Sequence, residues 1–202
     1  MTVEQPFEIR GVKIPMLNLS GGYADLLGGT LDTSVFTPWD LVIKEIKADG
    51  ANNVILIVSA GVMKNPRDTS FDPTLNYNPD LDAIRKIAKL VEANGMTVTI
   101  STFANIANVI SGDPSTVGID RPYPTDAQSW LKNFGTSVTQ WAKFAQEVGA
   151  SAFIPFTDET QHLFRDSSLT SGWVDLIEQI RQVFTGQLST GWWTPGYRRA
   201  SR

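Results

Sequence analysis

The sequence has no cysteine and only one histidine among its 202 residues. The lack of cysteine excludes disulfide bonds and thiol chemistry, and a lone histidine leaves no usual ligand set for zinc. We therefore expect no metal and no cofactor. The net charge of −4 gives no basic field for nucleic acid. No segment approaches ~18 consecutive apolar residues, so no membrane span is expected.

The first ten residues also lack the features of a secretory signal. They hold no apolar run and no small-residue cleavage site. The length suffices for one domain with a sizeable core. The aromatic content is the unusual feature of the composition. The chain has six Trp, four Tyr and ten Phe, and several of them lie beside predicted loops.

Four predicted amphipathic helices each end in a glycine, and a short strand begins a few residues later. Glycine at this position lets the backbone turn left-handed. The pairs are Gly50 before Asn53–Val58, Gly95 before Thr97–Thr102, Gly149 before Ala152–Phe156, and Gly186 before Leu188–Thr190. Thr125 or Asp126 is expected to cap the third helix. With Val12–Leu19 as the first strand, the rhythm predicts a parallel βα sheet.

The loops of this pattern are unequal. The loops from helix to strand are short, whereas those after the first three strands run to about 18–22 residues. Long loops in a compact domain are usually functional, and parallel α/β folds bind ligands at the carboxyl ends of their strands. The site is therefore predicted in these loops, the alternative being that they are only surface decoration.

Five strands use nearly the whole chain, whereas a typical (β/α)8 barrel takes ~250 residues. We predict one partial domain over residues 1–202, a TIM-type (β/α)8 barrel truncated after about five β-strands. The alternative is a complete five-stranded doubly wound α/β sheet. A barrel fragment would have unpaired sheet edges, which favour self-association. Residues 194–202 are expected to form a disordered or non-native tail.

Asp158 and Glu159 are the sharpest chemical candidates. They follow the predicted strand Ala152–Phe156 and open a polar loop. A sugar-cleaving site needs a protonated carboxyl poised beside the leaving oxygen, and apolar neighbours such as Phe153 and Phe156 would raise a carboxyl pKa. The alternative is that Asp158 caps the next turn while Glu159 is a solvated loop acid.

Four further residues are candidates for binding substrate. Asn105 comes just past the third strand, Trp192 just past the fifth, and Tyr23 lies in the first loop. His162 follows the acid pair and could orient a carboxylate or bind a hydroxyl. Flat aromatic faces at loop ends suit sugar rings. Trp141, in contrast, is expected to lie in the core.

Four stretches of the sequence indicate a family: Trp141–Ala150, Phe153–Glu159, Trp173–Ile177 and Gly186–Thr190. Together they resemble clan-A glycoside hydrolases, most closely the β-mannanase-type family 113 and its relatives in families 5 and 53. The resemblance implies that Glu159, or Asp158 if no gap is placed, is the acid/base. It also implies a nucleophilic Glu on strand seven. Residues 101–105 lack the Lys and His often found on strand three of the family.

The resemblance implies hydrolysis of β-linked mannan- or glucan-type polysaccharide by a retaining mechanism. Oligo- or polysaccharide is then the partner. The 202-residue chain is expected to be inactive alone, because it shows no strand seven. An extracellular location is expected from the substrate class, although no N-terminal signal is seen. The alternative function is a non-catalytic carbohydrate-binding α/β module.

Overall fold

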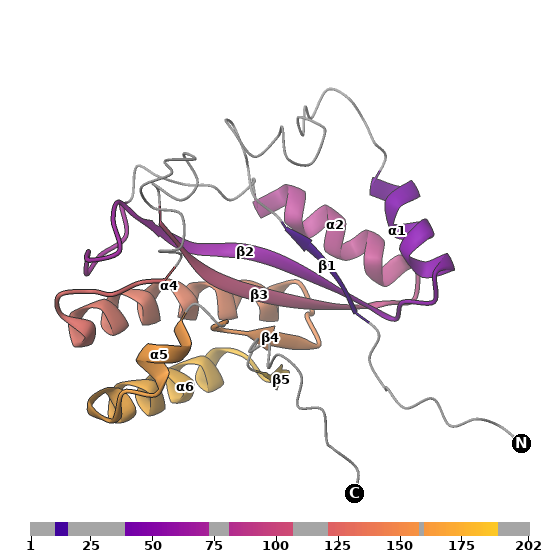
Figure 1. The fold of residues 1–202 in the computed structure, drawn as a ribbon. Helices are drawn as coiled ribbons and strands as arrows, with labels where there is room; N and C mark the ends of the chain where they lie inside the picture. Colours follow the sequence, from indigo (N-terminus) through magenta and orange to yellow (C-terminus); the bar gives the residue numbers. More distant parts are fainter. Residues whose placement is uncertain (1–10, 16–38, 73–80, 107–120, 158–159, 190–202) are drawn as a thin grey trace, which may run out of the picture.

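The structure is a computed structural model of the chain, and it describes residues 11–15, 39–72, 81–106, 121–157 and 160–189. Strands and helices alternate along it (Figure 1). In chain order the elements are β1 (Gly11–Pro15), α1 (Trp39–Ala48), β2 (Asn53–Met63), α2 (Leu81–Ala93), β3 (Thr97–Ile106), α4 (Ala127–Glu147), β4 (Ala152–Ile154), α5 (Gln161–Phe164), the 3₁₀ helix η3 (Ser167–Leu169), α6 (Thr170–Val183) and β5 (Gln187–Leu188).

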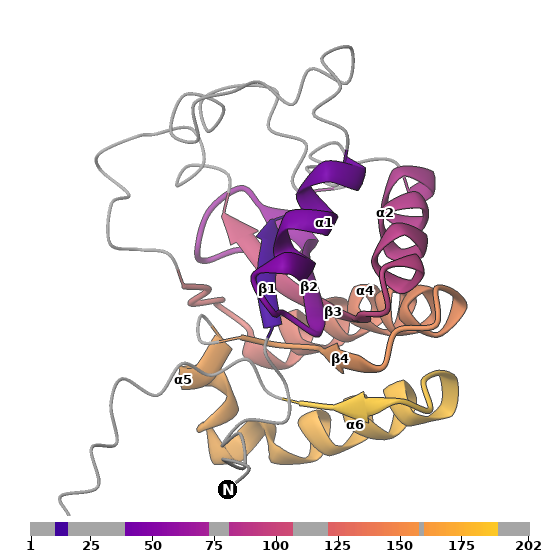
Figure 2. The same cartoon turned by 90° about the vertical axis from the view of Figure 1, so that its right-hand side faces the viewer.

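The five strands form one parallel sheet whose spatial order follows the chain, β1-β2-β3-β4-β5. Because parallel crossovers are right-handed, this order places successive helices on the same side of the sheet. Figure 2 shows α1, α2, α4 and α6 around the outside of a curved sheet. A doubly wound sheet reverses its strand order at one point. The order is therefore that of a (β/α)8 barrel, as predicted, and not of the doubly wound alternative.

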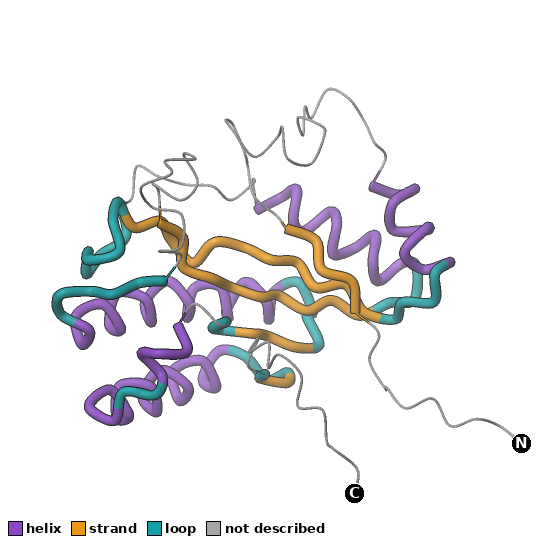
Figure 3. The backbone as a smooth tube through the Cα atoms, viewed as in Figure 1, coloured by secondary structure: helices purple, strands orange, loops and turns teal. Residues whose placement is uncertain are grey.

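Short loops join helices to strands at the amino edge of the sheet, as Figure 3 shows for α1 to β2 and α2 to β3. Gly50, Gly95 and Gly149 have φ of 84°, 69° and 71°, so the predicted left-handed turns are confirmed at three joints. The prediction is wrong for Gly186, since the positive-φ glycines do not include it. There a Cβ would lie 2.8 Å from the Ser151 carbonyl oxygen and overlap the Phe184 ring. Close packing, not backbone handedness, requires that glycine.

The two central strands are longer than predicted, because β2 runs to Met63 and β3 to Ile106. Val54, Leu56 and Val58 of β2 are fully buried, whereas Ile55 is half-buried. Successive side chains of a strand point to opposite faces. The fully buried face is the one that belongs to the common core with the helices.

A series of aromatic contacts links the loop after β2 to the end of β4. Phe134 of α4 lies 6.3 Å from the ring of Phe71 and stacks on Trp130 at 4.8 Å. The Phe134 ring is also 6.3 Å from Trp173 of α6, which in turn lies 5.3 Å from Phe156. Phe134 is 0% exposed and contacts three of these rings, so it forms the centre of this cluster.

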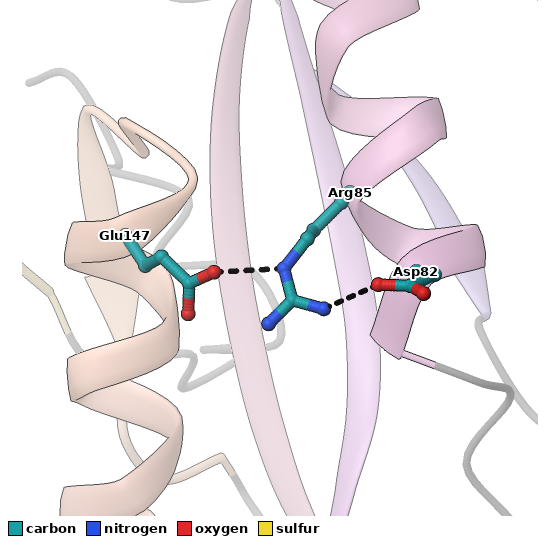
Figure 4. Close-up of polar contacts among 3 residues, drawn as sticks. All are labelled: Asp82, Arg85 and Glu147. Carbon is teal, nitrogen blue, oxygen red and sulfur yellow. Dashed lines mark hydrogen bonds and ion pairs between the residues drawn. The ribbon is translucent and has the colours of Figure 1, made fainter.

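Arg85 connects α2 to α4 on the outer surface (Figure 4). Its Nε donates to Glu147 Oε1 at 2.8 Å and its Nη1 to Asp82 Oδ1 at 2.7 Å. The guanidinium also lies 5.3 Å from the centre of the Phe144 ring. The hydrogen bond from Arg85 lowers the pKa of the Glu147 carboxyl and raises the pKa of Arg85.

Acid should release this contact and weaken the fold. A carboxyl whose pKa is lowered by folding contributes stability above its unfolded pKa, and that contribution is lost as the pH falls through the folded pKa. We expect the midpoint of thermal unfolding to fall between about pH 5 and pH 3, less steeply in Glu147→Gln than in the parent. Asp175→Asn, which changes an exposed carboxylate on α6, is the control. Equal slopes in Glu147→Gln and the parent would contradict the expectation.

Candidate active site

Strand β2 contains a bulge near its carboxyl end. The pairing of β2 with β3 shifts between Ser59 and Gly61, so that Phe103 pairs with Ser59 and Ala104 with Gly61. A bulge bends its strand and redirects the neighbouring side chains, and such features are frequent beside active sites. The sequence predicted a loop from Ser59 onward, and this boundary is wrong.

Asn105 holds the bulge from the neighbouring strand. Its Nδ2 donates to Ser59 Oγ at 2.9 Å. The same hydroxyl accepts from the Gly61 N–H and donates to the Gly61 carbonyl, both at 3.2 Å. Asn105 is buried at 6% exposure and lies within β3, not just past it as predicted.

Helix α4 holds the same bulge from the other side. Trp141 Nε1 donates to the Ser59 carbonyl at 3.0 Å, and the Ser137 hydroxyl donates to the Ala60 carbonyl. Trp141 is buried, so its prediction as a core residue is confirmed. A Cβ on Gly61 would overlap the ring of Phe71. The glycine therefore lets Phe71, in the loop after β2, pack directly against the bulge. The carboxyl end of β2 is thus fixed by three separate elements.

The exit of β4 is fixed on both sides of the acid pair. Thr102 Oγ1 of β3 donates to the Pro155 carbonyl at 2.7 Å. The Thr157 carbonyl accepts from the Thr160 N–H at 3.2 Å and from its hydroxyl at 2.9 Å. Thr160 is 0% exposed. The residues on both sides of Asp158–Glu159 are therefore held by hydrogen bonds, Pro155 to β3 and Thr160 to Thr157.

His162 of α5 joins this exit to the segment that precedes α4. Its Nε2 lies 2.6 Å from the Pro122 carbonyl oxygen. A carbonyl oxygen can only accept, so Nε2 carries the proton. The ring lies 4.6 Å from that of Tyr123 at an interplanar angle of 35°. His162 therefore holds the segment before α4 in position. Its predicted role toward a carboxylate or a hydroxyl stays a prediction.

The described residues include only two of the six predicted site residues, Asn105 and His162. Asp158, Glu159, Tyr23 and Trp192 lie outside them. Asn105 contacts β2, and His162 contacts the segment before α4, so the two lie at different elements of the same edge. The predicted desolvating residues Phe153 and Phe156 are buried, and both pack toward α6 and the residue that follows it.

Sequence reasoning missed Ser59 and Tyr123. Ser59 stands in Ser59-Ala60-Gly61, which reads as a turn, and only contacts with distant residues show it as part of a strand. Tyr123 stands between Pro122 and Pro124 in a long loop. An aromatic residue held between two prolines is the signal that could have found it, because proline restricts the backbone on both sides.

The described segments contain no group of three His, Cys, Asp or Glu side chains that could hold a metal ion. No helix in the described part of the chain is long and apolar enough to cross a membrane.

A parallel sheet whose strand order follows the chain is the arrangement of the (β/α)8 barrels, which hold their active sites at the carboxyl edge. The model of Glycoside Hydrolase Family 113 matches residues 40–192. The chain belongs to that family. A search among curated proteins found no match.

Solved structures show the same fold. A complex of a GH113 β-1,4-mannanase is 16% identical, with a TM-score of 0.62 over 89% of this chain and 54% of that one. The GH113 β-mannanase AaManA from Alicyclobacillus acidocaldarius, in complex with ManMIm, is 19% identical, with a TM-score of 0.60 over 78% and 49%. The β-glycosidase from Thermosphaera aggregans is 10% identical, with a TM-score of 0.54 over 94% and 55%. The chain therefore spans about half the length of these proteins.

Proposed function

We propose that this chain forms the acid/base half of an active site that hydrolyses β-linked, mannan-type polysaccharide with retention of configuration. The observation that carries the proposal is the family match over residues 40–192, which includes the end of β4 and the acid pair. Two of the solved relatives are β-mannanases. The anchored exit of β4 supports a site at this edge of the sheet.

Glu159 is the proposed acid/base, with Asp158 as its neighbour or substitute. The carboxyl would first protonate the glycosidic oxygen as the bond to the leaving sugar breaks, and would then accept a proton from the attacking water. The family residue is Glu, and its longer side chain reaches further than that of Asp. Asn105, His162, Tyr23 and Trp192 are the proposed subsite contacts.

A retaining mechanism needs a second carboxylate ~5–5.5 Å from the first, to act as nucleophile. By resemblance, that residue is a Glu on strand seven, whereas the described sheet contains five strands. We therefore expect the 202-residue chain to bind oligosaccharide without cleaving it.

This proposal is tested by incubating the purified chain with β-mannan, β-glucan and galactan, and measuring reducing ends released and the affinity for matching oligosaccharides. The expected result is affinity for manno-oligosaccharides with no release. Release at a rate typical of enzymes, about 1–10³ s⁻¹, would contradict the assigned half-site.

We also expect the chain to self-associate through the edge strands β1 and β5. Light scattering on the same sample tests this expectation, and a monodisperse monomer would contradict it.

The alternative function, a non-catalytic carbohydrate-binding module, gives the same result for the chain alone. The two functions differ once a nucleophile is supplied. A binding module would stay inactive in a completed barrel, whereas an acid/base half would then turn over substrate.

A further inference from the structure

Tyr123 stands out among the exposed side chains. Of the five large hydrophobic residues that the described part of the chain leaves exposed, it is the aromatic one, at 45% exposure. A single exposed apolar side chain needs no explanation by itself. The contacts of Tyr123, however, are unlike those of a side chain left loose at the surface.

The loop after β2 holds the backbone around Tyr123 in place. Its backbone N–H donates to the Pro66 carbonyl at 2.7 Å. Two residues later, the Thr125 N–H donates to the Arg67 carbonyl at 3.0 Å. The Tyr123 backbone therefore pairs with the loop after β2 and has a fixed position before any ligand arrives.

The ring itself is held by His162. The two ring centres are 4.6 Å apart, and His162 Nε2 donates to the carbonyl of Pro122, the residue before Tyr123. The His162 ring thus packs against the Tyr123 ring, and the hydrogen bond to Pro122 fixes the position of His162. Nearly half of Tyr123 stays open to solvent despite this contact.

The support of this ring follows the acid pair in the chain. His162 is three residues beyond Glu159, and Thr160 donates from its N–H and its hydroxyl to the Thr157 carbonyl. The ring therefore lies where the loop after β2, the segment before α4 and helix α5 meet. These segments follow β2, β3 and β4, so Tyr123 lies among the loops at the carboxyl edge, where parallel α/β folds bind ligands.

We propose that Tyr123 is a stacking platform for one hexose ring of a β-linked oligosaccharide, in a subsite beside helix α5. The inference rests on the proposed function. The C–H face of a pyranose ring is apolar and flat, so it covers an aromatic ring, while the sugar hydroxyls remain hydrated at its rim. Because Tyr123 is already immobilised, binding costs little further side-chain entropy. The phenol hydroxyl is not required for stacking.

The test is isothermal titration of the 202-residue chain with mannopentaose. Tyr123→Ala should weaken binding by at least about fivefold, and Tyr123→Phe should stay within about twofold of the parent. The matched control is Val174→Ala on α6, which removes a side chain of similar exposure, 48%, from another surface. Circular dichroism on each variant checks the fold.

Each outcome decides the proposal. Unchanged affinity in Tyr123→Ala overturns the platform while mannopentaose binding, and with it the proposed function, stands. Loss in Tyr123→Phe as large as in Tyr123→Ala also overturns it, because stacking would then not be the cause. Binding of cellopentaose or a galacto-oligosaccharide that depends on Tyr123, without mannopentaose binding, supports the platform and contradicts the mannan substrate. Absence of Tyr123-dependent binding to all three sugars overturns the platform.

Discussion

In a barrel completed by the second half of a family 113 β-mannanase, replacing Glu159 with glutamine should lower the rate of β-mannan hydrolysis by about 10²- to 10⁴-fold. The amide is nearly isosteric with the carboxyl but can neither donate a proton to the leaving oxygen nor accept one from water. The measurement is the initial rate of reducing-end release with both halves present and with each half alone.

Asp158→Asn is the matched control for this variant, since it removes a carboxyl one residue away. We expect its effect to remain below about tenfold. An aryl mannoside with an acidic leaving group should also be less sensitive to Glu159→Gln than mannan, because its leaving oxygen needs less protonation. If Asp158→Asn has the larger effect, the acid/base is Asp158. If neither variant slows hydrolysis, the assignment of the acid pair fails.

Replacing Phe134 with alanine should destabilise the folded chain by about 3–5 kcal/mol, a large share of the roughly 5–15 kcal/mol that holds a domain together. Phe134 is fully buried and contacts the rings of Phe71, Trp130 and Trp173. Its removal leaves a cavity between rigid rings that cannot collapse to fill it. Urea unfolding followed by tryptophan fluorescence would measure the change.

Two variants calibrate this result. Phe134→Leu keeps most of the volume and should cost less than Phe134→Ala. Val174→Ala removes an exposed side chain from the neighbouring helix α6 and should change the free energy of unfolding by no more than about 0.5 kcal/mol. A loss in Phe134→Ala no greater than in Val174→Ala would show that the aromatic cluster contributes little to stability.

The alternation of helices and strands could be predicted from the sequence because its signals are local. Glycines at Gly50, Gly95 and Gly149 end helices through their own backbone conformation. Asp126, one of the two predicted caps, caps α4 by accepting from the Ser129 N–H at 3.0 Å. Neighbouring residues suffice for such features, whereas the fourth glycine depends on packing and was assigned the wrong role.

The carboxyl edge was harder to predict because distant residues define it. The bulge at Ser59 depends on Asn105 and Trp141, which are 46 and 82 residues further along the chain. Helix α5 was taken for a polar loop, yet Trp173 Nε1 donates to the carbonyl of its Leu163 at 3.2 Å. None of these three contacts joins residues fewer than 10 positions apart.

The same distinction applies to the candidate site. Asp158 and Glu159 stand out by residue type and position after a strand, so the sequence alone identified them as candidates. The role of His162 in holding Tyr123 depends on where the segment before α4 lies, and no local pattern gives that. The prolines on both sides of Tyr123 indicate a restricted backbone, but they do not indicate that its ring packs against His162.

The sequential strand order has a consequence for how the chain acquires its structure. Every strand after β1 pairs with the strand made just before it, so each βα unit can dock as soon as it is synthesised. The sheet therefore grows in one direction, at a rate set by translation, about 5–20 residues per second. At each stage the newest strand forms an open edge opposite β1, and an open edge can pair with another chain. The acid pair follows β4 in the chain, so it is synthesised only after β1, β2 and β3.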